Sequence, residues 1–377
     1  MKVSAQFDGG NIEVIEASDP STIRLKIRPD SQADFKQWFY FRLQGAQNQA
    51  CNITIVNAGE ASYLPGWEQY QAVASYDRME WFRVATRFEN GELRIDHTPD
   101  CSEVYYAYFE PYSFDRHLDL IAFSQVSPLC KVIDLGSTLE GHDISLLRIG
   151  EAGADKLNLW IIARQHSGET MAEWFMEGFL NRLLDSADPC SRQLLQKAVF
   201  YIVPNMNVDG SVKGNLRANA AGQDLNRQWL NPSMEKSPEV FVVRQKMHEV
   251  GVDFFLDVHG DEGLPYVFLA GCEGIPSYDK AHHAVEQKFK QAFMQASPEL
   301  QDHYGYDKLL PTQANLSLAN QYVGEQFRCL SYVLEMPFKD NANLPDSEYG
   351  WSSARSIKLG EAALQAILSV LGDLRAA

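Results

Sequence analysis

The run Leu157-Asn-Leu-Trp-Ile-Ile-Ala163 restricts the possible folds of this chain more than any other stretch. It is apolar at nearly every position, so a strand made from it would be buried on both faces, as in a sheet covered by helices. His166 and Glu169 follow shortly after it. From Glu169 to Asp185, Met171, Phe175, Phe179 and Leu183 recur at four-residue steps, which predicts a helix that packs on the sheet. We therefore expect a strand, a sharp turn that carries His166 and Glu169, and a helix.

Similar strands and helices alternate through the rest of the C-terminal part. Ser237 and Pro238 have the pattern of a helix N-cap and first residue, and Gly251 fits the position after the helix end. This alternation predicts an α/β domain whose sheet has helices on both faces. In such folds, functional residues gather at the carboxyl ends of the strands. The other expected strands are 131–134, 144–149, 199–203, 252–258 and 331–335, and the other expected helices are 278–296 and 353–374.

Residues 1–115 have a different pattern, with apolar residues at every second position. Ile23, Leu25 and Ile27 alternate with polar residues, and the stretch 51–55 repeats this period, as strands do. Asn90-Gly91 separates two further strand-like runs, 80–88 and 93–96, and is a strong hairpin turn signal. We therefore expect an all-β sandwich domain over 1–115 and a second domain over 116–377.

Charge and composition exclude several classes of protein. The formal net charge is −17, and so acidic a chain repels phosphate, so we expect neither nucleic acid nor an anionic membrane as a partner. The six cysteines include no C-x-x-C pair, which argues against a disulfide framework and a cysteine-bound metal. The first ten residues lack the apolar core of a secretory signal, and no apolar run is long enough to span a bilayer. We therefore expect a cytoplasmic protein, and its oligomeric state is left open.

Three side chains could form a metal site. His166 and Glu169 have an H-x-x-E spacing, which lets one imidazole and one carboxylate bind the same cation. A catalytic zinc ion needs a third protein ligand and an open position for water, and His259, after the apolar run 252–258, is the best candidate. Glu335, at the end of another expected strand, is then a further carboxylate that the metal does not need as a ligand.

Further residues follow in a characteristic order. Pro204-Asn-Met-Asn-Val-Asp-Gly210, Arg217, Asp224-Leu-Asn-Arg227, His259 and Glu335 succeed one another along the chain. With His166 and Glu169, this order resembles the M14 zinc metallocarboxypeptidases, and specifically the cytosolic carboxypeptidase subfamily. The resemblance implies a mixed sheet flanked by helices, preceded by an all-β domain. It also implies hydrolysis of the C-terminal peptide bond of a peptide or protein, with the release of acidic residues in that subfamily.

The resemblance also assigns roles to individual residues. His166, Glu169 and His259 would bind Zn²⁺, and Glu335 would act as the general base. Arg217 would stabilise the oxyanion of the tetrahedral intermediate, because its charge is permanent.

Substrate binding is assigned in the same way. Asn226 and Arg227 would hold the terminal carboxylate of the substrate. For an acidic substrate side chain the candidates are Arg328 and Lys308, and Tyr322 is the candidate for the family's mobile active-site tyrosine.

Two aspartates are candidates for orienting the histidines, since metal-bound imidazoles usually have such partners. Asp257 precedes His259 by two residues, on the same face of the expected strand. Asp224 matches the position of the aspartate that orients a histidine in the family. His117 is expected to be structural.

Two other functions remain open. A zinc amidohydrolase of the acylase type uses the same ligand pattern on N-acyl amino acids, but the N-terminal domain and Pro111-Tyr112 argue against it. A non-catalytic peptide-binding protein is disfavoured because every ligand, base and arginine is retained.

Overall fold

The first part of the chain is built from ten short strands. The computed structural model describes residues 1–310 and 312–374. The ten strands are β1 (Lys2–Ser4), β2 (Glu13–Glu16), β3 (Ile23–Lys26), β4 (Tyr40–Gln44), β5 (Cys51–Ile55), β6 (Val73–Ser75), β7 (Phe82–Arg83), β8 (Ala85–Glu89), β9 (Glu92–His97) and β10 (Glu103–Ala107). They form two five-stranded sheets, ordered β1-β4-β10-β6-β7 and β2-β3-β5-β9-β8. In β5, Cys51, Ile53 and Ile55 are buried and the residues between them are not, so the predicted all-β domain is confirmed.

The predicted hairpin lies between β8 and β9. Asn90 and Gly91 have φ angles of 54° and 81°, the left-handed conformations that such a tight turn requires. The single strand predicted over 80–88 is wrong, because β7 pairs with β6 in one sheet and β8 pairs with β9 in the other. The chain changes sheets at Val84.

The second part of the chain contains one mixed sheet. Its strands are β11 (Cys130–Ser137), β12 (Asp143–Ile149), β13 (Leu157–Ala163), β14 (Ala198–Val203), β15 (Phe254–Asp261), β16 (Phe268–Ala270) and β17 (Leu330–Pro337). They lie in the order β11-β12-β14-β13-β15-β17-β16. The four central strands β14, β13, β15 and β17 are mutually parallel, whereas the outer pairs are antiparallel. This agrees with the predicted mixed sheet.

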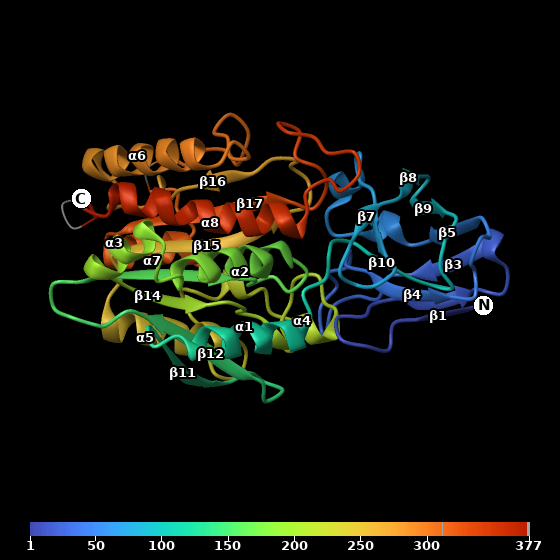
Figure 1. Cartoon of the computed structure of the whole chain (residues 1–377), viewed down its shortest axis with the longest axis horizontal. Helices are drawn as coiled ribbons and strands as arrows, with labels where there is room; N and C mark the ends of the chain where they lie inside the picture. Colours follow the sequence, from blue (N-terminus) through green and yellow to red (C-terminus); the bar gives the residue numbers. More distant parts are fainter. Residues whose placement is uncertain (311, 375–377) are drawn as a thin grey trace.

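Helices cover both faces of the mixed sheet (Figure 1). They are α1 (Phe114–Val126), α2 (Met171–Leu183), α3 (Pro189–Lys197), α4 (Val208–Lys213), α5 (Pro238–Val250), α6 (Lys280–Ala296), α7 (Ala319–Phe327) and α8 (Ser353–Val370). Leu159 and Ile161 of β13 pack in one core with α2, α6 and α8. Trp160 and Ile162, which point the other way, pack with α5 and α7. The complete burial of β13 on both faces is therefore confirmed.

The elements that were not predicted include α3, α4, α7 and β16. These helices have nine, six and nine residues and β16 has three, too few to give a clear apolar period. The two strands expected to end at 258 and 335 continue to Asp261 and Pro337, so His259 and Glu335 lie inside β15 and β17.

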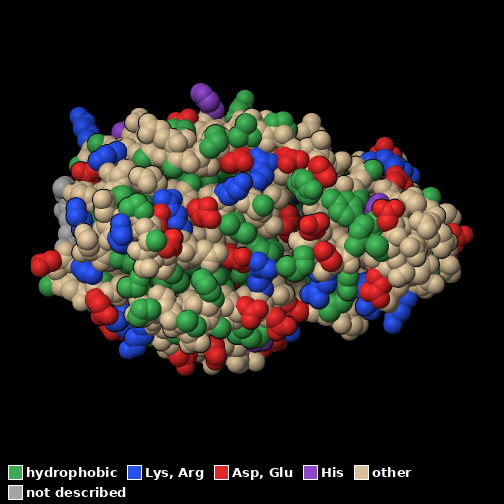
Figure 2. All heavy atoms as spheres, viewed as in Figure 1, with side chains coloured by type: hydrophobic (Ala, Val, Ile, Leu, Met, Phe, Trp, Pro, Cys, Tyr) green, Lys and Arg blue, Asp and Glu red, His purple; other side chains and the backbone are tan. Residues whose placement is uncertain are grey.

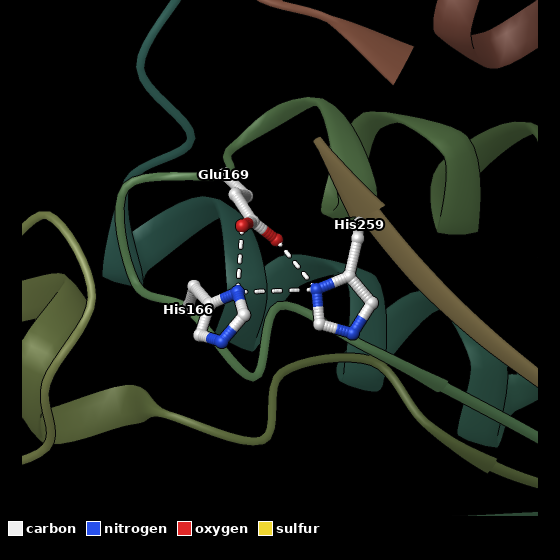
Figure 3. Close-up of side chains that lie close together, drawn as sticks. All are labelled: His166, Glu169 and His259. Carbon is white, nitrogen blue, oxygen red and sulfur yellow. Dashed lines mark hydrogen bonds and ion pairs between the residues drawn. The ribbon is translucent and has the colours of Figure 1, made fainter. Parts of the chain in front are cut away.

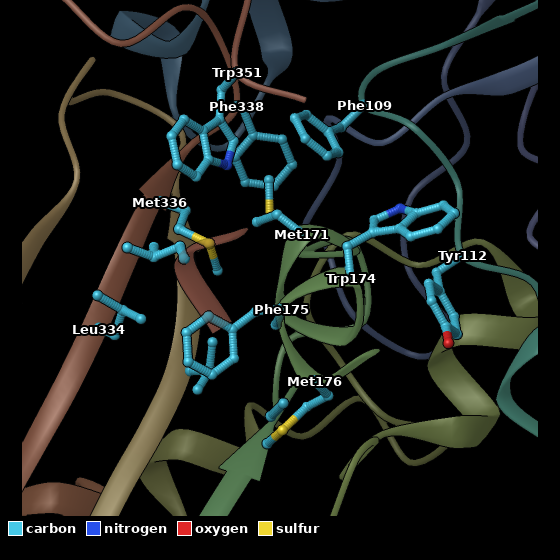
Figure 4. Packing of buried hydrophobic residues seen from close by; sticks show 14 of the residues in the cluster. Phe109, Tyr112, Met171, Trp174, Phe175, Met176, Leu334, Met336, Phe338 and Trp351 are labelled. Atoms are coloured by element: carbon cyan, nitrogen blue, oxygen red, sulfur yellow. The ribbon is translucent and has the colours of Figure 1, made fainter. Parts of the chain in front are cut away.

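The two parts of the chain meet in a continuous apolar junction (Figure 4). The rings of Tyr108 and Phe338 stack with their centroids 4.6 Å apart. Arg83 of the first part donates hydrogen bonds to the carbonyl oxygens of Phe338 and Trp351 in the second. α1 begins at Phe114 with Ser113 as its N-cap, so the boundary predicted at 115/116 falls in its first turn and stays a prediction.

Among the helices within 1–310 and 312–374, none is both long enough and apolar enough to cross a membrane.

Candidate active site

The pairing of the central strands brings the candidate residues together. β13, β15 and β17 are adjacent and parallel, and His259 of β15 stands opposite Glu335 of β17 in the sheet register. His166 and Glu169 lie in the turn between β13 and α2. Side chains that are far apart in sequence therefore meet at the carboxyl end of one sheet.

His166, Glu169 and His259 form a compact, buried cluster (Figure 3). Nδ1 of His166 is 2.6 Å from one Glu169 oxygen, and Nδ1 of His259 is 2.8 Å from the other. The two Nδ1 atoms are 3.2 Å apart. Ligands of a tetrahedral zinc ion at ~2.0–2.1 Å would lie roughly 3.3 Å from one another. The distance between the two Nδ1 atoms is close to this value, whereas the two distances to the Glu169 oxygens are shorter.

The charges of the cluster also suit a cation. Burial alone would raise the pKa of Glu169, but the two histidines lower it to about 2, so the carboxylate is ionised. Burial alone would lower the pKa of His259, but Asp257 and Glu169 outweigh it and raise the pKa well above its usual value. Positive charge is thus favoured where two imidazole nitrogens face each other. Two nitrogens and one carboxylate are a donor set that zinc prefers, so the residues fit a zinc ion.

Each histidine has an aspartate on its other nitrogen, as predicted. Oδ1 of Asp224 is 3.1 Å from Nε2 of His166, and Oδ2 of Asp257 is 2.8 Å from Nε2 of His259. Gln165 donates a hydrogen bond of 2.6 Å to Asp257 and fixes that carboxylate in turn. These contacts hold the rings so that both Nδ1 atoms face the same point.

A buried polar network supports the turn that carries His166. Arg164 adopts φ 57° and donates a hydrogen bond of 2.9 Å to the carbonyl oxygen of Ser167. Its guanidinium also pairs with Glu173 of α2, which is 2.7 Å from Nδ1 of His117. His117 is therefore buried against Glu173 of α2 and is not part of the His166, Glu169 and His259 cluster, in line with its expected structural role.

Glu335 faces the cluster across a cavity of about 840 Å³ that His166, Glu169 and His259 also line. One Glu335 oxygen accepts a hydrogen bond of 2.9 Å from the Tyr306 hydroxyl. The other is buried and has no hydrogen-bond partner among the described residues. Burial raises the pKa of Glu335, and the nearby His259 opposes this rise.

Arg217, Asn226 and Arg227 line the same cavity. Nε of Arg217 donates a hydrogen bond of 2.7 Å to Asp224, so one carboxylate links Arg217 to His166. Oδ1 of Asn226 accepts from the amide of Ala319, which leaves its Nδ2 to donate to a ligand. The Arg227 side chain is 47% exposed, so its guanidinium is accessible.

The structure does not bring Arg328 or Tyr322 to the cavity. Arg328 is exposed and ends α7, next to the amino end of β17, whereas Glu335 lies near the other end of that strand. The Tyr322 hydroxyl is 2.9 Å from His248, on the other face of the sheet. A position between His259 and Glu335 in the sequence was therefore not enough to place Arg328 at the cavity. Lys308, the alternative to Arg328, does line the cavity.

Tyr306 is the residue that the sequence analysis missed. Its hydroxyl is shared between Glu335 and Asp261, at 2.9 and 2.7 Å. Although about half of the side chain is exposed, desolvation of the hydroxyl and the nearby carboxylates of Glu335 and Asp261 raise its pKa well above the usual value, so the phenol stays protonated. It lies between α6 and α7, in a segment whose described residues form no helix or strand.

Comparison with known proteins identifies both parts of the chain. Residues 3–109 match the model of the cytosolic carboxypeptidase N-terminal domain, and residues 119–351 match that of the zinc carboxypeptidases. A metallo-carboxypeptidase of Burkholderia cenocepacia is 50% identical with a TM-score of 0.96, over 98% of this chain and 99% of that one. One of Pseudomonas aeruginosa, solved with (2-guanidinoethylmercapto)succinic acid, is 48% identical with a TM-score of 0.97, over 100% of both chains.

More distant relatives are longer. Mouse cytosolic carboxypeptidase 3 is 26% identical over 72% of this chain, but the match spans only 30% of the mouse protein.

Proposed function

The chain belongs to the zinc carboxypeptidase family and is a metallocarboxypeptidase, and on that premise we propose that it removes the C-terminal residue of a peptide or protein with Glu335 as general base. The observation that carries this proposal is the meeting of three converging ligand atoms and a partly unpaired carboxylate at one cavity.

His166, Glu169 and His259 would hold the zinc ion. A zinc ion bound there would act as a Lewis acid and would lower the pKa of water toward about 7, which would make hydroxide available at neutral pH. The free Glu335 oxygen would accept the proton of that water and deliver it to the leaving amine. Tyr306 donates to the other oxygen and so orients this carboxylate.

Two arginines would act on different parts of the substrate. Arg217 would stabilise the oxyanion. Burial alone would lower its pKa, but Asp224 outweighs it and raises the pKa, so the guanidinium stays charged. Arg227, with the amide of Asn226, would bind the terminal carboxylate and so restrict cleavage to the chain end.

The preferred terminal residue is acidic in this proposal, with Lys308 in place of Arg328 as its partner. Lys290 also lines the cavity, but its ammonium is 2.8 Å from Glu286 and 3.7 Å from Glu273. Lys308 is exposed at the cavity and is the better partner for a substrate carboxylate. On the face in Figure 2, acidic and basic side chains are interspersed, so long-range attraction from that face does not explain such a preference.

A peptide panel tests the activity. Peptides that differ only in the last residue (Glu, Asp, Lys, Arg or Leu) would be assayed as free acids and as C-terminal amides, alongside N-acyl amino acids. We expect single residues to be released from the free acids only, a loss of turnover with a chelator, and its return with zinc. Equal turnover of the amides, or turnover of N-acyl amino acids alone, would contradict the proposal.

Charge reversal tests the specificity. Lys308→Glu should reduce turnover of the Glu-ending peptide far more than that of the Leu-ending one, and the matched control Arg328→Glu should change neither. Equal losses on both peptides would refute the role of Lys308.

The cytoplasm is our proposed location. It is supported by the cytosolic name of the mouse relative and by six cysteines that are all free thiols.

A further inference from the structure

The N-terminal β domain forms part of the wall of the active-site cavity. Tyr63 and Pro65, which follow β5, line the cavity together with Arg217 and Glu335. Lys339, next to the end of β17, donates hydrogen bonds of 3.0 and 2.9 Å to the carbonyl oxygens of Pro65 and Glu68. These hydrogen bonds connect this edge of the β domain to the chain directly after β17, the strand that carries Glu335.

Asp30 of the same domain is buried against the backbone that carries Arg217. Its carboxylate accepts hydrogen bonds from three consecutive amides, those of Leu216 at 2.6 Å, Arg217 at 2.8 Å and Ala218 at 2.8 Å. Burial raises the pKa of Asp30 to about 6, so the carboxyl is ionised at neutral pH and can accept from all three. Both oxygens are used, which fixes the peptide planes on either side of Arg217.

Neighbouring contacts hold the same loop at further points. Ser31 donates its amide to the side chain of Asn215, at 3.1 Å, and Gln32 donates to the carbonyl oxygen of Ala220, at 3.0 Å. Gly222 has φ 74°, and a side chain there would clash with the backbone of Gln32. Residues 215–222 have no regular structure of their own. Their conformation is thus held in part by contacts with the β domain, beside the hydrogen bonds that Asn207 and Gly168 make to the same loop.

The Arg217 side chain also contacts this domain. Its guanidinium carbon is 5.9 Å from the ring centroid of Phe35 and 5.7 Å from that of Tyr63. On the other side, Nε donates to Asp224. Aromatic rings and a carboxylate therefore restrict the guanidinium, while the backbone amide of the same residue is held by Asp30.

We propose that Asp30 and Phe35 are positioning residues for Arg217, so that the β domain completes the catalytic site. The proposal rests on the proposed role of Arg217 in stabilising the oxyanion. Asp30 holds the backbone and Phe35 the guanidinium, and neither touches the substrate.

The main test is Asp30→Asn in the full-length protein. Asparagine keeps the shape but replaces one acceptor oxygen with a donor group, which would face an amide that also donates. We expect kcat on a hydrolysed peptide to fall roughly 10- to 100-fold, as for other residues that orient an active group. KM and zinc content should be unchanged. The matched control is Asp34→Asn, an exposed carboxylate four residues away, which should behave as the wild type.

A double-mutant cycle separates positioning from general damage. In an Arg217→Met background, Asp30→Asn should cause little further loss, because the residue that it positions is already gone. An equal loss in both backgrounds, unchanged kcat, or a loss explained by zinc content would each overturn the proposal.

A second variant covers the case in which Asp30→Asn does not fold. Phe35→Leu removes the ring beside the guanidinium and would be put through the same cycle, with a smaller loss of kcat expected. Wild-type kcat in Phe35→Leu, or the same loss without Arg217, would overturn the proposal. A wild-type protein that cleaves no peptide would instead refute the proposed function.

Discussion

The active-site cavity has two walls that are built differently. The strand wall carries His166, Glu169, His259 and Glu335, all on or directly after the central strands of the mixed sheet. The loop wall carries Arg217, Asn226 and Arg227 on the segment 214–228, which contains only one short 3-10 helix, Leu225–Arg227. The strand wall is fixed by backbone pairing within one domain, whereas the loop wall is held by contacts that include a second domain.

This difference separates two requirements of the proposed chemistry. Metal ligands and a base must stand at fixed distances, and a parallel sheet supplies these through its register. Groups that stabilise the oxyanion and the substrate carboxylate lie on a loop, where side-chain clamps such as Asp30 have to supply the rigidity. A substitution in the strand wall should therefore reduce the rate of hydrolysis most, whereas a substitution in the loop wall should reduce it less.

The largest effect is expected from Glu335→Gln in the strand wall. The amide cannot accept the proton, so kcat should fall by ~10²–10⁴, while zinc content and peptide binding remain. Single-turnover kinetics and metal analysis would measure this. Asp261→Asn is a useful comparison, because Asp261 also accepts from Tyr306 but does not stand opposite His259. If Glu335→Gln kept a tenth of the activity or more, the assigned base would be wrong.

An intermediate effect is expected from Arg217→Met in the loop wall. Loss of a group that stabilises the oxyanion costs roughly 10²–10³ in kcat. Arg217→Lys should recover little, since lysine lacks the Nε that donates to Asp224 and the planar group beside the rings. As a control, Arg227→Met should raise KM more than it lowers kcat. If Arg217→Met mainly raised KM and Arg227→Met mainly lowered kcat, the roles assigned to the two arginines would have to be exchanged.

The smallest effect is on stability and concerns Glu239, which forms a hydrogen bond with Asn219 of the loop wall. This buried residue of α5 accepts a hydrogen bond of 3.3 Å from Asn219, and burial raises its pKa from 4.5 to about 7. The folded state thus holds the proton more tightly than the unfolded state. Its stabilising contribution is complete below pH ~4.5 and is lost as the pH rises to 7 and above, about 3 kcal/mol in total.

Urea unfolding at pH 5 and pH 8 would measure this contribution. Glu239→Gln should unfold at similar urea at pH 5 and be more stable than the wild type at pH 8. The exposed neighbour Glu235 provides the control, since Glu235→Gln should leave the pH dependence unchanged. An identical pH dependence in wild type and Glu239→Gln would show that Glu239 is not the titrating group.

The strand wall could be predicted from the sequence and the loop wall only in part. Buried strands such as β13 are continuous apolar runs, and the polar residues just after them are visible in the sequence. Arg217, Asn226 and Arg227 were found because their order resembles a family motif, and all three line the cavity. Their assigned roles remain predictions.

Arg328, Tyr306 and Asp30 illustrate the limits of prediction from sequence. Arg328 was a candidate because the resemblance places the specificity residue between His259 and Glu335, but it ends α7 near the amino end of β17, and Tyr322 does not line the cavity either. Tyr306 comes from a segment without apolar period. Asp30 lies 187 positions before Arg217, and no pattern within either segment indicates that they meet. Contacts of this kind depend on how the two parts of the chain pack against each other.

The parallel pairing of β15 and β17 has a consequence for how such enzymes can diversify. Nearly all of the chain between these two strands lies outside the central sheet, and it includes Tyr306 and Lys308. Insertions, deletions or exchanges in the loops of this excursion, outside β16, α6 and α7, should leave His259 opposite Glu335, because β15 and β17 pair directly with each other. Grafting the excursion from one homologue into another should therefore alter which chain ends are accepted and keep the hydrolytic step intact.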